Sequence, residues 1–199
     1  MEVKMKFSAV ILAGGKSSRM KMNKALLPAG DKTFIETIAG QLAKYFNEVI
    51  IITNTIQTYE FLPYKKYPDI IINKGPLGGI HSGLTHASNE YSFVTACDMP
   101  FIDGAAARKL CEMANGYDGV VPKKGEYLQP LFAVYSKNCI PYIEKCLDEE
   151  HYKIISFYPC VKILYPDWSQ LLGDEKAAKT FFNINTPEDL KIYRKYEES

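Results

Sequence analysis

The chain is 199 residues long, with 47% hydrophobic residues, 24% charged residues and a formal net charge of +1. This length suits one globular domain, and the composition excludes disordered, collagen-like and coiled-coil chains. The near balance of charge argues against a broad surface for nucleic acid or for a membrane, so neither is expected as a partner.

The cysteines and the amino-terminal residues point to a cytoplasmic protein. The five cysteines are odd in number and no two are spaced as Cys-x-x-Cys, so neither a disulfide framework nor a structural zinc site is expected. The apolar run 7–13 is short and is followed by Gly14, Gly15 and Lys16 instead of a cleavage-like site. No apolar stretch approaches the ~20 residues of a membrane span.

The first half of the chain alternates predicted strands and helices. The apolar run 7–12 stops at a glycine pair, which is typical of a strand buried on both faces. Thr33 and Glu36 have the spacing of a capping box, so a helix is expected to begin there. Two further apolar runs, 49–52 and 69–72, predict the second and third buried strands.

The second half continues the same alternation. A helix is expected from near Leu77, and Asp103 and Thr186-Pro187 mark the starts of two others. Strands are predicted at 91–96, 118–121 and 128–135. The alternation predicts βαβ units and an α/β fold with a mainly parallel sheet flanked by helices, in a single domain spanning 1–199.

Glycine and polar residues follow each of the first four predicted strands. They are Gly14 and Gly15, then Asn54, Asn73 and Asp98. Because right-handed crossovers bring the carboxyl ends of parallel strands to one edge, these residues are expected to meet there. Ligands of open α/β sheets bind at that edge.

The segment 12–28, LAGGKSSRMKMNKALLP, has the composition of a phosphate-binding loop. It combines a glycine pair with four cations, Lys16, Arg19, Lys21 and Lys24. Glycines let backbone N–H groups approach an anion, and the cations offset the charge of a nucleoside triphosphate. The pattern is neither Walker A nor the dinucleotide GxGxxG. A solvated loop whose lysines only maintain solubility is the alternative interpretation.

Asp98 is the candidate metal ligand. It follows the predicted strand 91–96, and Mg²⁺ takes only one or two protein carboxylates when phosphate and water supply its other ligands. A turn cap before Pro100 is the alternative role, although Asp103 suits capping better because it directly precedes a helical pattern.

Five segments in order resemble the motifs of the molybdenum cofactor guanylyltransferase family. They are LAGGKSSRMKMNKALLP, GPLGGIHSGL, CDMPF, QPLFAVY and FFNINTPEDL. The resemblance implies a Rossmann-like nucleotidyltransferase fold. It also implies transfer of GMP from GTP to molybdopterin carrying molybdenum, with release of pyrophosphate.

The resemblance also implies roles for individual residues. In the mainly nucleotide-binding half, 1–100, the nucleotide would contact Leu12, Ala13, Gly14, Gly15, Lys24, Asn54, Asn73 and Asp98. Arg19, Lys24 and Asp98 would be catalytic, and Asp98 would hold Mg²⁺. In our interpretation the acceptor would meet Gly78, Gly79, His81, Gln129, Pro130 and Asn185, with residues 101–199 mainly devoted to it. Three positions depart from the family pattern. The family usually has Gly where this chain has Lys21, Asp where it has Asn23, and Asp near the position of Asn73.

Other functions remain open from the sequence. The chain could be a cytidylyltransferase for the same pterin or a sugar-phosphate nucleotidyltransferase, and a non-catalytic GTP-binding regulator is a third alternative. A dinucleotide-dependent oxidoreductase is disfavoured because GxGxxG is missing and Asn54 stands where an acidic residue would end the second strand. Transient contact with cofactor-delivery proteins or molybdoenzyme chaperones is a further expectation.

Overall fold

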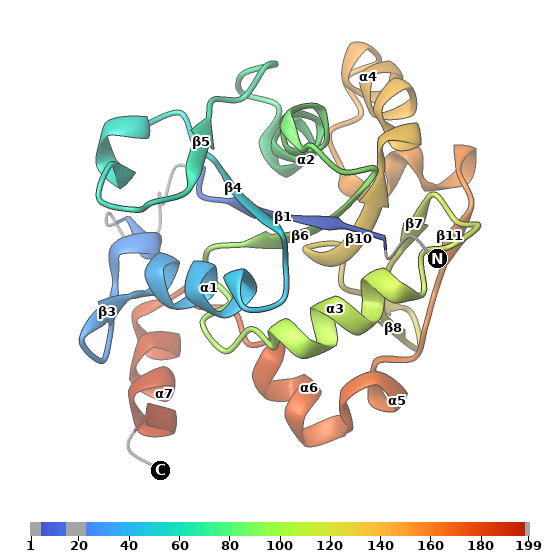
Figure 1. The fold of residues 1–199 in the computed structure, drawn as a ribbon. Coiled ribbons are helices and arrows are strands. Elements are labelled where there is room, and N and C mark those ends of the chain that lie inside the picture. Colours follow the sequence, from blue (N-terminus) through green and yellow to red (C-terminus); the bar gives the residue numbers. More distant parts are fainter. Residues whose placement is uncertain (1–4, 15–22, 198–199) are drawn as a thin grey trace.

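A seven-stranded sheet forms the centre of the protein in the computed structural model, which describes residues 5–14 and 23–197 (Figure 1). Its strand order is β11-β7-β10-β6-β1-β4-β5. The strands are β1 (Phe7–Leu12), β4 (Glu48–Ile52), β5 (Lys65–Tyr67), β6 (Tyr91–Ala96), β7 (Gly119–Val120), β10 (Phe132–Ser136) and β11 (Ile163–Leu164). Only β10 runs against its neighbours within this sheet, so the prediction of a mainly parallel α/β sheet is confirmed.

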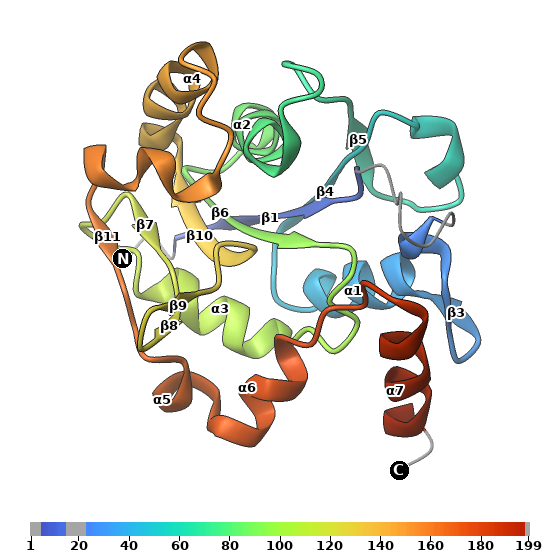
Figure 2. The same ribbon diagram turned by 180° about the vertical axis from the view of Figure 1, so that it is seen from behind.

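Helices cover both faces of the sheet, as the two opposite views show (Figures 1 and 2). Ile11 of β1 belongs to one apolar cluster, shared with α1 (Phe34–Ala43), α3 (Gly104–Glu112) and α6 (Asp174–Thr180). Val10 belongs to the opposite cluster, shared with α2 (Gly75–His86) and α4 (Ile140–Asp148). Because both faces are covered, β1 is buried along its whole length, as its mostly apolar sequence predicts.

A third apolar cluster joins the two ends of the chain. Leu27 and Phe34 pack there with Ile184 and Tyr193, the last of which lies on α7 (Pro187–Glu197). The hairpin β2 (Pro28–Ala29) and β3 (Lys32–Thr33) leads into α1 beside this cluster. This packing places the segment before α7 next to the end of the predicted phosphate loop and the start of α1.

The predicted helix starts are confirmed. Glu36 N donates to Thr33 Oγ1 over 3.4 Å and Thr33 N donates to Glu36 Oε2 over 2.8 Å, which completes the capping box of α1. Asp103 Oδ1 accepts a 2.8 Å hydrogen bond from Ala106 N and caps α3. Thr186 Oγ1 accepts from the first turn of α7 over 3.2 Å.

The predicted third strand is wrong. The strand that pairs with β4 on the side away from β1 is β5 at Lys65–Tyr67, and Pro68 follows it. Ile70 and Ile72 lie beyond β5 with 48% and 63% of their surfaces exposed. An edge strand is covered less completely than a central one and tolerates lysines, so apolar content is a poor guide to it.

The predicted strand 128–135 divides into two. Tyr127–Leu128 forms β9, which pairs with β8 (Lys123–Lys124) in a separate hairpin. A turn at Gln129 follows, where Phe132 N donates to Gln129 O over 3.1 Å, and β10 begins at Phe132. The short helix α5 (Trp168–Leu172) completes the named helices.

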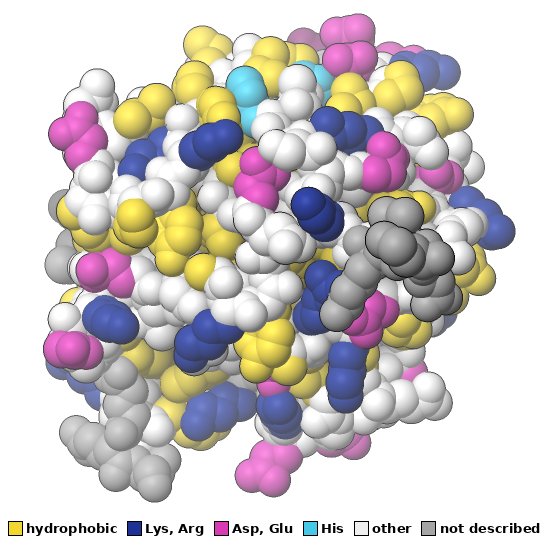
Figure 3. Space-filling view, in the orientation of Figure 1, with side chains coloured by type: hydrophobic (Ala, Val, Ile, Leu, Met, Phe, Trp, Pro, Cys, Tyr) yellow, Lys and Arg dark blue, Asp and Glu magenta, His cyan; other side chains and the backbone are white. Residues whose placement is uncertain are grey.

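The surface agrees with the balanced composition. On the face drawn in Figure 3, lysine and arginine side chains lie among acidic ones across the whole view. Among the residues that the structure describes, none of the helices is both long and apolar enough to cross a bilayer.

Candidate active site

The central strands end level with one another at one edge of the sheet. Leu12 at the end of β1 lies opposite Ile52 of β4 and Ala96 of β6. Ala13 N continues the pairing with a 2.9 Å bond to Ile52 O, and Cys97 N bonds to Leu12 O over 3.2 Å. The residues that follow these strands therefore leave the sheet side by side, as the strand pattern predicts.

Three polar side chains from distant parts of the sequence meet at this edge. Lys24 Nζ lies 3.7 Å from Asp98 Oδ2 and donates a 2.7 Å hydrogen bond to Asn185 Oδ1. Lys24 begins the 3₁₀ turn η1 (Lys24–Leu26), Asp98 follows β6, and Asn185 precedes α7. A bond of 3.0 Å from Ile184 N to Asp98 O fastens the last two segments together.

Asp189 supports this arrangement from the first turn of α7. Its Oδ2 accepts 2.8 Å hydrogen bonds from the backbone N–H groups of both Asn185 and Thr186. The bond from Asn185 N is the largest of the effects that lower the pKa of the Asp189 carboxyl. The loop that carries the Asn185 amide is thus held by an ionised side chain at neutral pH.

Burial raises the pKa of the Asp98 carboxyl, and the nearby Lys24 ammonium opposes that rise. The carboxylate and the Asn185 amide oxygen both face one cation, the Lys24 ammonium. Hard oxygens of this kind are the ligands that Mg²⁺ prefers, with phosphate and water completing its shell. The described residues contain no group of three or more His, Cys, Asp or Glu side chains that could bind a metal without such help.

Cys97 is next to Asp98 but does not have the properties of a nucleophile. Burial, followed by repulsion from Asp98, raises the pKa of its thiol to about 12. The thiol is therefore protonated at neutral pH, which suits its interpretation as a small buried residue.

Asn54 forms a hydrogen-bonded pair with Asp69 on the side of the sheet edge formed by β4 and β5. Asn54 Nδ2 donates to Asp69 Oδ2 over 2.8 Å, and Asp69 N donates to Asn54 Oδ1 over 3.0 Å. The sequence interpretation missed Asp69 because it placed this residue inside a strand. Asn73, predicted to follow the third strand, lies instead two residues before α2, with a φ of 61°.

The expected acceptor residues lie in different places. Gly79 packs against β1, because a Cβ there would come within 3.1 Å of Leu12 Cδ2, and a Cβ at Gly78 would come within 3.0 Å of Lys74 Cβ. His81 is buried, with its Nε2 3.0 Å from Glu144 Oε1 of α4, so it lies between two helices.

Gln129 and Pro130, two further expected acceptor residues, precede β10. Because Phe132 lies opposite Thr95 of β6, this turn is near the same edge as Asp98. Pro130 O accepts a 2.9 Å hydrogen bond from the Tyr135 hydroxyl. Gly15 and Arg19 lie outside the described residues, as do Lys16 and Lys21.

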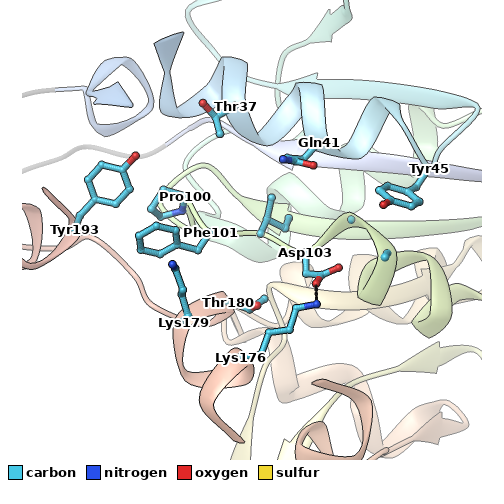
Figure 4. Close-up of a pocket in the computed structure, with 13 residues that line it drawn as sticks. Thr37, Gln41, Tyr45, Pro100, Phe101, Asp103, Lys176, Lys179, Thr180 and Tyr193 are labelled. Carbon is cyan, nitrogen blue, oxygen red and sulfur yellow. Dashed lines mark ion pairs between the residues drawn. The ribbon is translucent and has the colours of Figure 1, made fainter. Parts of the chain in front are cut away.

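A cavity of about 570 Å³ lies between α1, α6 and α7 (Figure 4). Pro100 and Phe101 line it, but neither Lys24 nor Asp98 does. Its two lysines already have partners, since Lys176 pairs with Asp103 and Lys179 Nζ lies 4.8 Å from the centre of the Phe101 ring. We therefore place the candidate site at the sheet edge and not in this cavity.

The model of the MobA-like NTP transferase domain matches residues 9–161. The chain belongs to the MobA-like NTP transferase family. A relative in this family from Pelotomaculum thermopropionicum, named "Probable molybdenum cofactor guanylyltransferase", is 45% identical over 92% of this chain and 89% of its own length. A relative of the same name from Clostridium perfringens strain 13 is 41% identical over 97% of this chain and 98% of its own length.

Solved structures agree with this MobA-like assignment. Molybdopterin-guanine dinucleotide biosynthesis protein A from Archaeoglobus fulgidus superposes with a TM-score of 0.84 at 25% identity, over 95% of this chain and 97% of that one. A 2-C-methyl-D-erythritol 4-phosphate cytidylyltransferase from Thermus thermophilus gives 0.72 at 15% identity, over 98% and 100% of the two chains. The second likeness shows the fold alone.

Proposed function

We propose that the protein transfers GMP from GTP to molybdopterin carrying molybdenum, forming the molybdopterin guanine dinucleotide cofactor and pyrophosphate. Membership of the MobA-like family and the names of the relatives support this assignment. The observation that carries it is the meeting of Lys24, Asp98 and Asn185 at the carboxyl edge of the sheet. A cation and a carboxylate at that edge suit a nucleotide phosphate and its metal ion.

The nucleotide is proposed to enter on the side of β1 and β4. The backbone of Leu12, Ala13 and Gly14 would contact it, and the Asn54–Asp69 pair would contact its nucleoside part. Guanine presents adjacent N–H donors, and a carboxylate such as that of Asp69 can accept hydrogen bonds from them. Arg19 is proposed to bind the leaving pyrophosphate.

Asp98 is proposed to hold Mg²⁺, with the Asn185 amide oxygen beside it. When bound, Mg²⁺ would supply positive charge to the phosphate oxygens around the reacting phosphorus. Lys24 would stabilise the charge that builds on the α-phosphate.

The proposed reaction needs no general base from the protein. An oxygen of the pterin's terminal phosphate attacks the α-phosphorus of GTP, and the bond from that phosphorus to the bridging oxygen of the β-phosphate breaks. A phosphate monoester is largely ionised near neutral pH, so its oxygen is already a nucleophile. Positioning and charge neutralisation then account for catalysis.

The test is to supply the purified protein with each of the four nucleoside triphosphates, Mg²⁺ and molybdenum-loaded molybdopterin. We expect pyrophosphate release with GTP and a product with the mass of the guanine dinucleotide. Preferential turnover of CTP would assign a cytidylyltransferase for the same pterin. In a parallel assay with sugar phosphates in place of the pterin, turnover found only there would assign a sugar-phosphate nucleotidyltransferase. GTP binding without turnover would leave a regulator.

A further inference from the structure

Tyr59 is a buried tyrosine whose hydroxyl lies among three segments of the nucleotide half. Tyr59 is the last residue of the 3₁₀ turn η2 (Ile56–Tyr59), which follows β4, and it is 1% exposed. Asn23 Nδ2 donates a 2.9 Å hydrogen bond to this hydroxyl. The single hydroxyl proton has two acceptors within reach, Asn23 Oδ1 at 3.2 Å and Ala13 O at 3.4 Å. The hydroxyl thus connects the end of β1 with the residue that precedes Lys24.

Asn23 passes the connection on to the turn that carries Lys24. Its Oδ1 accepts a 3.1 Å hydrogen bond from Ala25 N, which makes Asn23 the cap of η1. Ala13 is tied in turn to β4 by the 2.9 Å bond from Ala13 N to Ile52 O. One hydroxyl therefore links two backbone segments that the proposed function assigns to the nucleotide.

Packing alone does not explain the hydroxyl. The ring would fill the same apolar space as phenylalanine, whereas a buried hydroxyl must find hydrogen-bond partners to offset its loss of water. Burial raises the pKa of the Tyr59 phenol, so the group remains neutral and can donate and accept at once. A tyrosine ring has few rotatable bonds, so it fixes the separation of the groups that its ends contact.

We infer that Tyr59 is a positioning residue of the nucleotide site. Its hydroxyl holds Ala13 O and the Asn23 side chain at a set separation, so that the Lys24 ammonium lies between Asp98 and Asn185. The inference rests on the proposed function, because it treats Ala13 and Lys24 as nucleotide contacts.

The experiment compares Tyr59→Phe with a matched control, Tyr91→Phe. Tyr91 donates its hydroxyl to a backbone carbonyl, Tyr117 O at 3.2 Å, but it begins β6 at the end away from Asp98. Well below either unfolding temperature, Tyr59→Phe should lower kcat/KM for GTP about tenfold, while Tyr91→Phe stays within about twofold. Equal kcat/KM in the wild type and Tyr59→Phe, with only the unfolding temperature lowered, would make Tyr59 merely structural and overturn the inference.

A double-mutant cycle tests the route through Asn23. If the hydroxyl acts through Asn23, the loss of kcat/KM in the double variant Tyr59→Phe/Asn23→Ala should be smaller than the product of the two single losses. Losses that simply multiply would contradict that route.

A binding measurement separates this inference from the proposed function. GTP with Mg²⁺ should raise the unfolding temperature of the wild type more than that of Tyr59→Phe. If the wild type binds GTP but transfers nothing, the proposed function fails, and the difference between the two temperature rises still decides the role of Tyr59. An equal rise in both proteins, or none in the wild type, would reject the inference.

Discussion

Lys24 and Asp98 form a partly buried ion pair, with Nζ 3.7 Å from Oδ2 and side-chain exposures of 17% and 23%. The distance is longer than a direct hydrogen bond, and Lys24 makes a closer polar contact with Asn185, at 2.7 Å. Each of the two charged side chains therefore keeps part of its surface open to solvent. The first two predictions concern these charges.

Asp98→Asn should reduce turnover with GTP by about 10²–10³-fold in the presence of Mg²⁺ as the only divalent ion. The substitution keeps the shape of the side chain and removes the charge that we propose binds the metal. Steady-state pyrophosphate release measures the effect. Asp103→Asn is the matched control, because Asp103 caps α3 and should affect stability more than turnover. Near-normal turnover of Asp98→Asn would rule out the metal assignment.

Lys24→Ala should lower turnover by a similar factor, about 10²–10³-fold, and should also shift the acid limb of the pH profile. The Lys24 ammonium lowers the pKa of Asp98, so its removal lets burial raise that pKa further. In a plot of kcat/KM against pH, activity should therefore begin to fall at a higher pH than in the wild type. Lys32→Ala, on the exposed β3, is the control. An unmoved acid limb would show that Lys24 does not act on Asp98.

Glu48→Gln should destabilise the protein at neutral pH without changing turnover, because Glu48 begins β4 at the end away from Asp98. Burial alone would raise the pKa of Glu48, but hydrogen bonds from Ser8 Oγ at 2.6 Å and from Ser88 N at 2.8 Å lower it overall. The carboxylate therefore contributes stability above its unfolded pKa, and this is lost as pH falls through the lower folded value.

Urea unfolding at several pH values measures that contribution. We expect the free energy of unfolding of Glu48→Gln to be about 1 kcal/mol lower than that of the wild type at pH 7. The effect is this small because the carboxylate is partly exposed to solvent. The difference from the wild type should shrink as the pH is lowered below about 4. A difference that stays constant with pH would contradict the role of the charge.

Two glycine substitutions should have opposite effects on stability. A Cβ at Gly83 of α2 would lie 2.5 Å from Val10 Cγ1, so Gly83→Ala forces α2 away from β1 and should cost about 1–3 kcal/mol. A Cβ at Gly40 of α1 meets no atom within 4 Å among the described residues, so Gly40→Ala should add about 0.5–1 kcal/mol. Thermal and denaturant unfolding check both, and a neutral Gly83→Ala would show that the two elements can separate.

The central strands and the helix caps were predictable because their signals are local. A mostly apolar run identified β1, and residue type at one position identified Thr33 and Asp103 as caps. The strand β5 was missed because an edge strand is only partly covered. As a result, Asp69 was assigned to a strand although it follows one. The antiparallel direction of β10 has no signal in its own apolar sequence, which is as buried as that of its neighbours.

The site was predictable where strand order decides it. The proximity of the Lys24 and Asp98 segments follows from β1 and β6 being parallel neighbours. The contact of Lys24 with Asn185 depends on Leu27 and Phe34 packing against Ile184 and Tyr193, and no local pattern signals that packing. The Asn54–Asp69 pair likewise depends on where β5 ends.

The reversed direction of β10 has a consequence for how such a protein diversifies. The connection from β7 to β10 leaves and re-enters the sheet at the edge that carries Asp98, and it contains the separate hairpin β8–β9. Its length and side chains can change while every pairing of the seven-stranded sheet is kept. Substrate preference on that side can therefore change with little effect on the strands β1 and β4, where we propose that the nucleotide binds.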